Sequence, residues 1–271
     1  MAKVTEQQRE LYSRLINSYK AKIETNLKEI RTLGIKAGQD KENEPKYRLK
    51  MIGYHLDNIS IYCAMNEVSL SLMDVKNSAF LDKARLELYE VLIALEKLVT
   101  KFIDVPFSDL QESLDKLTDL NDVDKLNLMK KIGYCMSLII EEFGENTKWK
   151  WSFIEIQGRF AVVAKNIFDF KKYQKLDNPS APGYVERRNH LTLIINQLTN
   201  ASNGYREKFE LSTKEIEDIK KAIDFQKALY RILNVIGDQK KIEACKKQIE
   251  VWQVLLEKQE LQNNTKKKET K

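Results

Sequence analysis

Only two histidines occur in the chain, His55 and His190, and they limit the catalytic chemistry that the sequence can support. A Ser-His-Asp or Cys-His arrangement needs one of them beside a nucleophile, and neither lies in such a local context. The Gly-x-Ser-x-Gly turn of hydrolases and the glycine-rich phosphate loops do not occur in the sequence either. We therefore favour a protein that is not an enzyme, and leave open a site built from Asp, Glu, Arg or Tyr.

The cysteines do not indicate a metal or redox site. Cys63, Cys135 and Cys245 are widely spaced, and each falls among apolar residues of a predicted helix. This pattern is typical of small buried side chains in a reducing compartment. No cysteine pair has zinc-ligand spacing, and no Glu-x-x-His motif of a di-iron protein occurs in the sequence. We expect no metal and no cofactor.

Basic residues supply two candidates for binding. The Lys148–Trp151 stretch could hold single-stranded nucleic acid, because bases stack on aromatic rings beside lysine. Trp149 belongs to an apolar row, however, which leaves Trp151 alone. Arg187 and Arg188 open a helix and suit an acidic partner, although an ordinary polar first turn is the interpretation we favour.

The net charge gives little further support for nucleic-acid binding. The chain carries +6, and its last six residues hold four Lys and one Glu, so half of the excess lies in the tail. Proteins that read nucleic acid usually carry the excess on a folded face. Nucleic-acid binding is therefore an alternative that we do not favour.

One segment, residues 148–173, is predicted to be a helix at the centre of the fold. Its apolar residues alternate in steps of three and four, a spacing that places them on one helical face. They are Trp149, Phe153, Ile156, Phe160, Val163, Ile167 and Phe170. The narrow polar strip on this helix includes Arg159. We expect Arg159 to form an ion pair or reach solvent, and a pocket that joins it to carboxylates is the remaining place for an enzyme site.

The first predicted helix, residues 5–33, has the heptad pattern of a helix that packs along another helix. Asn26 occupies one position in this row. It either fixes the register of the pair or lies solvated at the edge, and we favour the second interpretation. This helix is our main candidate for binding a partner or a second copy of the chain. The residues that we expect to bind a partner are Ile16, Tyr19, Ile23, Ile30, Trp151, Arg187 and Arg188.

The whole sequence predicts an all-α protein, an antiparallel bundle of about nine helices that could resemble a helical repeat at its C-terminal end. Glycine and proline are rare, at 9 and 4 residues, so few turns are available. The strongest break is Lys175–Gly183, because Pro179 and Pro182 cannot lie inside a helix. We predict an N-terminal bundle over residues 1–174, a three-helix lobe over 184–262 and a disordered basic tail over 263–271.

These patterns predict a function in protein–protein interaction. Heptad rows and large apolar faces, without a recognisable catalytic motif, favour a scaffold or a subunit of an assembly. No secretory signal and no apolar run long enough to cross a bilayer is visible, so we expect a cytoplasmic protein without a membrane span.

Overall fold

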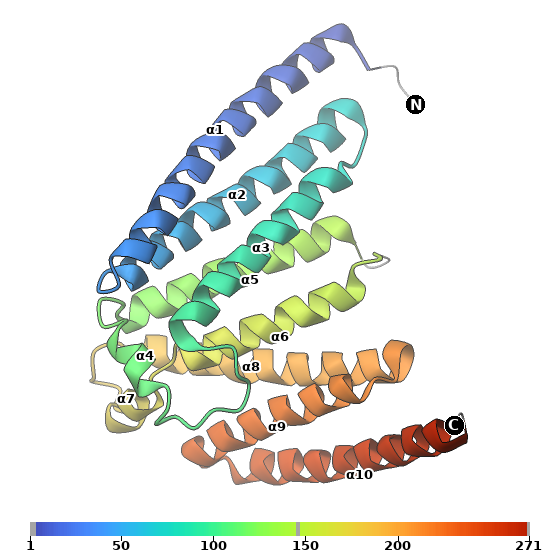
Figure 1. The fold of residues 1–271 in the computed structure, drawn as a ribbon. Helices are drawn as coiled ribbons and strands as arrows, with labels where there is room; N and C mark the ends of the chain where they lie inside the picture. The colour runs from blue at the N-terminus through green and yellow to red at the C-terminus, as the bar shows by residue number, and fades with distance from the viewer. Residues whose placement is uncertain (1–3, 145–146, 270–271) are drawn as a thin grey trace. The chain divides into compact units, whose positions relative to one another are not determined.

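The structure, a computed structural model, describes residues 4–144 and 147–269, with side chains as far as residue 263. Over these residues it contains ten α-helices and no strand (Figure 1), which confirms the all-α prediction. The helices are α1 (Glu6–Gln39), α2 (Glu44–Met73), α3 (Ser78–Val99), α4 (Gln111–Asp115), α5 (Asp122–Phe143), α6 (Lys150–Asn166), α7 (Phe170–Lys175), α8 (Tyr184–Lys208), α9 (Ile216–Ile236) and α10 (Gln239–Glu269).

Residue contacts divide the chain into two compact units. The first comprises Met1–Thr100 with Asn127–Lys148, and the second comprises Lys101–Leu126 with Trp149–Lys271. This grouping differs from the predicted division near residues 174–184. The difference arises because α6 packs against α8, so the apolar helix that we expected in an N-terminal bundle belongs to the second unit.

In the first unit, α1 packs against α2, and α2 packs against α3. Thr5 and Gln8 form a reciprocal capping box at the start of α1. The helix continues through two glycines to Gln39, beyond the predicted end at residue 33. Asn26 is fully buried and donates a hydrogen bond of 2.9 Å to Asn58 on α2, so the solvated position that we favoured is wrong. The pair joins two helices at one level, which fixes their register.

In the second unit, α6, α8, α9 and α10 pack in series, each against the next (Figure 1). Residues 160–168, at the end of α6 and just after it, are all buried, as the sequence predicted for a central helix. The predicted helix over 148–173 is nevertheless interrupted. Asp169 leaves the helical conformation and its side chain accepts a hydrogen bond of 2.8 Å from the Lys172 amide, which starts α7 as a separate helix.

The C-terminal part of the second unit differs from the prediction in two details. Ser212 and Glu215 have the spacing of a capping box in the sequence, but the box does not form, because residues 209–213 make a π-turn (η1, Phe209–Thr213) and Lys214 adopts a positive φ of 54°. The α10 backbone continues to Glu269 through most of the tail predicted to be disordered, and residues 270–271 lie outside the described part. Among the described helices, none is both long and apolar enough to cross a bilayer.

Candidate functional site

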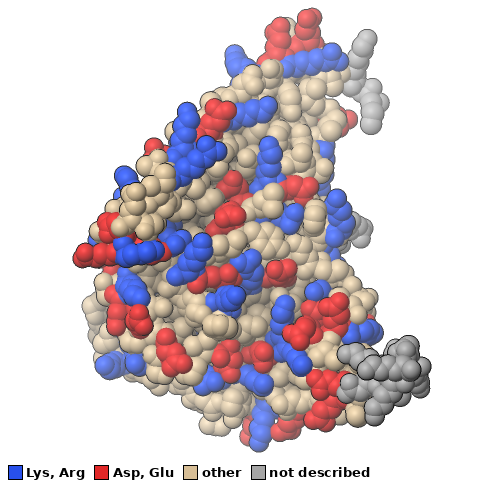
Figure 2. Space-filling model, viewed as in Figure 1, with Lys and Arg blue, Asp and Glu red and all other residues tan. Residues whose placement is uncertain are grey.

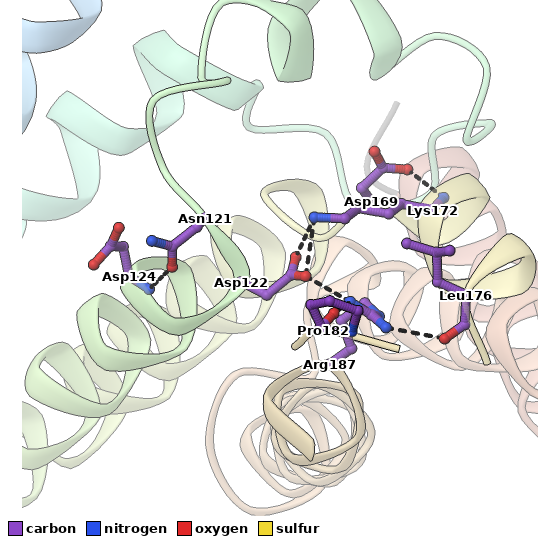
Figure 3. Close-up of polar contacts among 8 residues, drawn as sticks. All are labelled: Asn121, Asp122, Asp124, Asp169, Lys172, Leu176, Pro182 and Arg187. Atoms are coloured by element: carbon purple, nitrogen blue, oxygen red, sulfur yellow. Dashed lines mark hydrogen bonds and ion pairs between the residues drawn. The ribbon is translucent and has the colours of Figure 1, made fainter. Parts of the chain in front are cut away.

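Arg187, at the start of α8, connects three separate segments of the second unit (Figure 3). Its Nη1 donates hydrogen bonds of 2.7 Å to Asp122 Oδ2 and 2.8 Å to the Pro182 carbonyl. Its Nη2 donates a hydrogen bond of 2.9 Å to the Leu176 carbonyl. The side chain is only 2% exposed, so these charge-assisted bonds lie away from water. Arg187 therefore holds both ends of the proline-rich loop against the first turn of α5.

Asp122 is the carboxylate at the centre of this cluster. It accepts contacts from Arg187 and from Lys172, whose Nζ lies 2.9 Å from Oδ2. Asp122 also lies in the first turn of α5, where the helix dipole favours a negative charge. One carboxylate thus binds two cations. Lys125, one turn further along α5, is partly buried, and burial lowers the pKa of its ammonium.

His190 is buried one turn after Arg187. Its Nε2 lies 3.1 Å from the Ala164 carbonyl, and since a carbonyl only accepts, Nε2 carries the proton and donates. The imidazole also packs edge-to-face on Phe168, with 5.2 Å between ring centroids. Burial lowers the pKa of His190 to about 4, so the ring is neutral at pH 7. His190 is therefore a packed core residue and not a general acid or base near neutral pH.

The space inside this cluster is very small. A cavity of about 10 Å³ is lined by Asp122, Lys125, Phe168, Asp169, Arg187 and His190. This volume is about that of a single water molecule. We conclude that the cluster stabilises the loop and the helix starts around it. Over the described residues, no group of three or more His, Cys, Asp or Glu side chains is arranged to hold a metal ion.

The two adjacent arginines that the sequence singled out point to different environments. Arg187 is buried in the cluster, whereas Arg188 is exposed. Arg188 donates a hydrogen bond of 2.9 Å to the Tyr173 hydroxyl and lies 3.8 Å from Asp177. Arg188 is therefore the more accessible of the two, and a role of either arginine in binding an acidic partner stays a prediction.

The candidates on α1 lie mainly at its interface with α2. Ile16 and Ile23 are buried, and Tyr19 and Ile30 are partly buried. In the first unit, this face of α1 is occupied by the chain itself. A role for these four residues in binding a partner stays a prediction, and the exposed side of α1 is mostly polar.

In the Lys148–Trp151 stretch, the groups best suited to bind nucleic acid already contact other residues of the chain. The Lys150 ammonium lies 4.9 Å from the centre of the Trp151 ring and 2.8 Å from a Glu207 carboxylate oxygen. Both the lysine charge and the partly buried indole thus have contacts within the chain. Figure 2 shows acidic and basic side chains interspersed on the face in view. The nucleic-acid alternative therefore depends on the sequence pattern alone.

Arg159, the candidate for an enzyme site on α6, is only partly buried. The fully buried residue of its polar strip is Asn166, whose Nδ2 donates a hydrogen bond of 3.2 Å to the Phe102 carbonyl. The strip therefore contains a partly buried arginine and a buried amide that donates to the backbone. A pocket that joins Arg159 to carboxylates stays a prediction.

One candidate surface on α10 was missed in the sequence. One row of α10, which has alternating steps of three and four in the sequence, packs inward, with Ile242, Cys245 and Trp252 buried. A second row, also spaced by three and four residues, lies on the opposite face, because each residue turns the helix by about 100°. We call it the outer stripe, and it consists of Ala244, Lys247, Val251, Val254, Lys258 and Leu261.

The outer stripe is unusually apolar for an exposed helix face. Val251, Val254 and Leu261 are 64–69% exposed. Lys247 and Lys258 lie between them and form no ion pair within the part of the chain that the structure describes. A stripe of this kind, on a helix whose other face packs on α9, has the spacing of a seam for another helix. The spacing of the outer stripe can be read in the sequence, but its apolar pattern is weaker than that of the inward row, because two of its six positions are lysines.

Beside α10, a groove of about 350 Å³ runs along α9 between α8 and α10. Apolar side chains such as Leu229 and Leu233 line it together with amides such as Gln226 and Gln248. The Cys245 thiol in this groove donates to Gln226, and burial raises its pKa to about 11. The thiol is therefore not a nucleophile at neutral pH.

A comparison with protein-family models matches the TP0443 family over residues 8–260. No curated protein and no solved structure matches the chain. The matched range includes Asp122, Arg187, Val251 and Val254, and it ends one residue before Leu261.

Proposed function

The chain belongs to the TP0443 family, and we propose that it is a non-enzymatic interaction or scaffold subunit that binds a helix of another protein through the outer stripe of α10. The observation that carries this proposal is the exposure of Val251, Val254 and Leu261 in one row. Isolated apolar residues are common on protein surfaces, but a row at heptad spacing is the pattern by which helices bind helices.

The lysines of the outer stripe indicate the chemistry of the partner. If two copies of α10 paired in antiparallel orientation about Val251 and Val254, Lys247 of one copy would face Lys258 of the other. In a parallel pair each lysine would face itself. Like charges in a seam are unfavourable, so the stripe disfavours a second copy of this chain. A partner helix with Asp or Glu at the positions that face the two lysines would form ion pairs with them.

We also propose that the subunit is cytoplasmic, and the cysteines support this compartment. Cys63, Cys135 and Cys245 are all free and buried. Burial raises the pKa of the Cys63 thiol to about 12, which keeps it protonated and unreactive. Free thiols of this kind suit a reducing compartment.

Site-specific photo-crosslinking in cells tests the proposal. A photoreactive phenylalanine derivative is placed at Val254, and in a matched control at Leu211, which is 71% exposed but lies outside the stripe. We expect a specific protein to be captured at Val254 only. We expect the capture to be lost in Lys247→Glu/Lys258→Glu and restored by Lys substitutions at the facing acidic residues of that protein.

Three results would contradict the proposal. They are equal capture at Val254 and Leu211, capture that survives reversal of both lysines, and capture of the chain by its own copies alone. Sedimentation of the purified chain provides an independent check, because we expect a monomer whose mass is the same in wild type and in Val251→Asp/Val254→Asp.

A further inference from the structure

The groove along α9, between α8 and α10, has the size and the lining of a small-molecule site. Its volume is about 350 Å³, within the range of about 300–1,000 Å³ that is typical of ligand pockets. Leu229 and Leu233 give it apolar surface, and three helices each contribute one carboxamide, from Asn196, Gln226 and Gln248. Apolar walls with a few polar groups that orient the ligand are characteristic of such pockets.

The length of the groove limits the size of a ligand. Its lining extends from Gln226 to Leu233 on α9 and from Lys241 to Gln248 on α10. Each stretch advances by seven residues, which is about 10 Å along a helix that rises about 1.5 Å per residue. A molecule of about two fused rings fits this length.

The carboxamide of Gln226 is held in place by its neighbours. Gln226 is 2% exposed, and the Cys245 thiol, on a side chain that is 4% exposed, donates a hydrogen bond of 3.0 Å to its Oε1. The Gln226 Nε2 donates in turn to Gln248 Oε1 at 3.3 Å. The three groups thus form a chain in which each donates to the next. Because Gln248 accepts through its oxygen, its Nε2 is the donor that the end of this chain offers to a ligand.

The charges around the groove favour a neutral ligand. Among the described residues that line it, only Lys241 is ionised at neutral pH, and its Nζ lies 3.0 Å from Asp238 Oδ2. The Cys245 thiol is uncharged, because burial raises its pKa to about 11. An ionic ligand would lose hydration in the groove and find no unpaired group of opposite charge among these residues.

We propose that this groove binds a neutral small molecule with a carbonyl group, a lactone, lactam or ketone built on about two fused rings. The rings lie against Leu229 and Leu233, and the carbonyl accepts a hydrogen bond from Gln248 Nε2. A helix of a partner protein fits the groove less well, because its backbone carbonyls are bonded internally and its apolar side chains would leave the carboxamides unpaired. The site is separate from the outer stripe, apart from Ala244, which lines both.

Three probes of similar shape test the proposal by NMR titration of the full chain, with the methyl groups of Leu229 and Leu233 as reporters. Coumarin carries a carbonyl and no N–H or O–H donor, indole carries an N–H donor and no carbonyl, and 2-naphthoate carries a negative charge. We expect coumarin to bind with a dissociation constant of about 1 mM and the other two at least about fivefold more weakly. The coumarin affinity should change less than about twofold between about 50 and 500 mM salt, since no ion pair is involved.

Two kinds of variant locate the binding. Gln248→Leu keeps a similar side-chain volume but removes the donor, so it should weaken coumarin about fivefold to tenfold and leave indole unchanged. Asn196→Trp places a large ring in the groove from an exposed position and should abolish the binding of coumarin. Asn203→Trp is the matched control, because Asn203 is also exposed on α8 but does not line the groove, and it should bind coumarin like wild type.

Several results would overturn the proposal. They are the absence of coumarin binding, equal or tighter binding of indole or 2-naphthoate, and coumarin binding that survives Asn196→Trp. Unchanged coumarin affinity in Gln248→Leu would show that the carbonyl does not bind to this donor. None of these variants alters the outer stripe, so a failure here leaves the crosslinking test at Val254 unaffected.

Discussion

Asp122 and Arg187 are 65 residues apart in the sequence, yet Oδ2 and Nη1 lie 2.7 Å from each other in the second unit. The pair connects the first turn of α5 to the first turn of α8. Because Arg187 also binds the carbonyls of Leu176 and Pro182, a single side chain holds the proline-rich loop between α7 and α8. Arg187 therefore stabilises the tertiary structure in a region where the sequence suggested a binding site.

Replacement of Arg187 tests this role. Arg187→Met should lower the free energy of unfolding by about 2–4 kcal/mol, because it leaves Asp122 and two carbonyls without their buried donor. The neighbouring exposed arginine is the control, and Arg188→Met should change the free energy by less than about 0.5 kcal/mol. Urea unfolding of both variants measures the difference. Similar losses of unfolding free energy in the two would argue against a stabilising role specific to Arg187.

His190 predicts an acid-sensitive contribution to stability. Its pKa is about 4 in the folded chain, against an ordinary value of 6.5. Between these values the unfolded chain binds a proton that the folded chain does not, so stability is complete above about pH 6.5 and is lost as pH falls towards 4. The loss should be about 1.4 kcal/mol at pH 5.5 and about 3 kcal/mol in total.

The variant His190→Gln isolates this effect, because an amide can donate to the Ala164 carbonyl but does not titrate. We expect wild type and variant to differ in the slope of unfolding free energy against pH between about pH 4 and pH 6.5. Urea unfolding at several pH values in this range measures both slopes. Parallel slopes would show that His190 is protonated in the folded chain.

Two glycines in helices predict opposite effects of the same substitution. At Gly158 on α6, an added Cβ would lie 2.7 Å from a ring atom of Tyr205 and 3.2 Å from one of Phe225, so Gly158→Ala should cost about 1–3 kcal/mol. At Gly53 on α2, nothing lies within 4 Å, and Gly53→Ala should stabilise by about 0.5–1 kcal/mol through helix propensity. Thermal unfolding should therefore shift down in one and up in the other.

The Asn26–Asn58 pair predicts strong coupling between two substitutions. Each amide uses one polar atom in the shared bond, and the other, Asn26 Oδ1 or Asn58 Nδ2, is buried without a hydrogen bond among the described residues. Asn26→Leu should cost about 1–3 kcal/mol because it leaves Asn58 unpaired. The double variant Asn26→Leu/Asn58→Leu should recover most of that loss, and a double-mutant cycle measures the coupling. Additive effects would show that the amides act independently.

Apolar spacing predicted the helices well where one face is strongly marked. On α10 the row with alternating steps of three and four contributes buried Ile242, Cys245 and Trp252, and residues 160–168 are buried as expected of a central helix. Spacing could not locate the break between α6 and α7. No proline or glycine marks it, and the α7 cap depends on how Asp169 orients its side chain toward the Lys172 amide.

Polar residues were harder to interpret, because their role depends on what lies opposite them. The heptad row identified Asn26 as unusual, but only Asn58 on the facing helix makes its burial favourable. Arg187 and Arg188 have the same chemistry in the sequence. Their fates differ because successive residues on a helix point about 100° apart, which turns one toward Asp122 and the other toward solvent.

The sequence alone determined that this protein is helical, since a period of three to four residues and a shortage of turn formers are local properties of the chain. The tertiary structure decided which polar groups pair, as Asp104 and Arg231 do, and which apolar row of α10 is left uncovered. Those outcomes depend on contacts between residues as far apart as 127 positions, and no local pattern encodes such contacts.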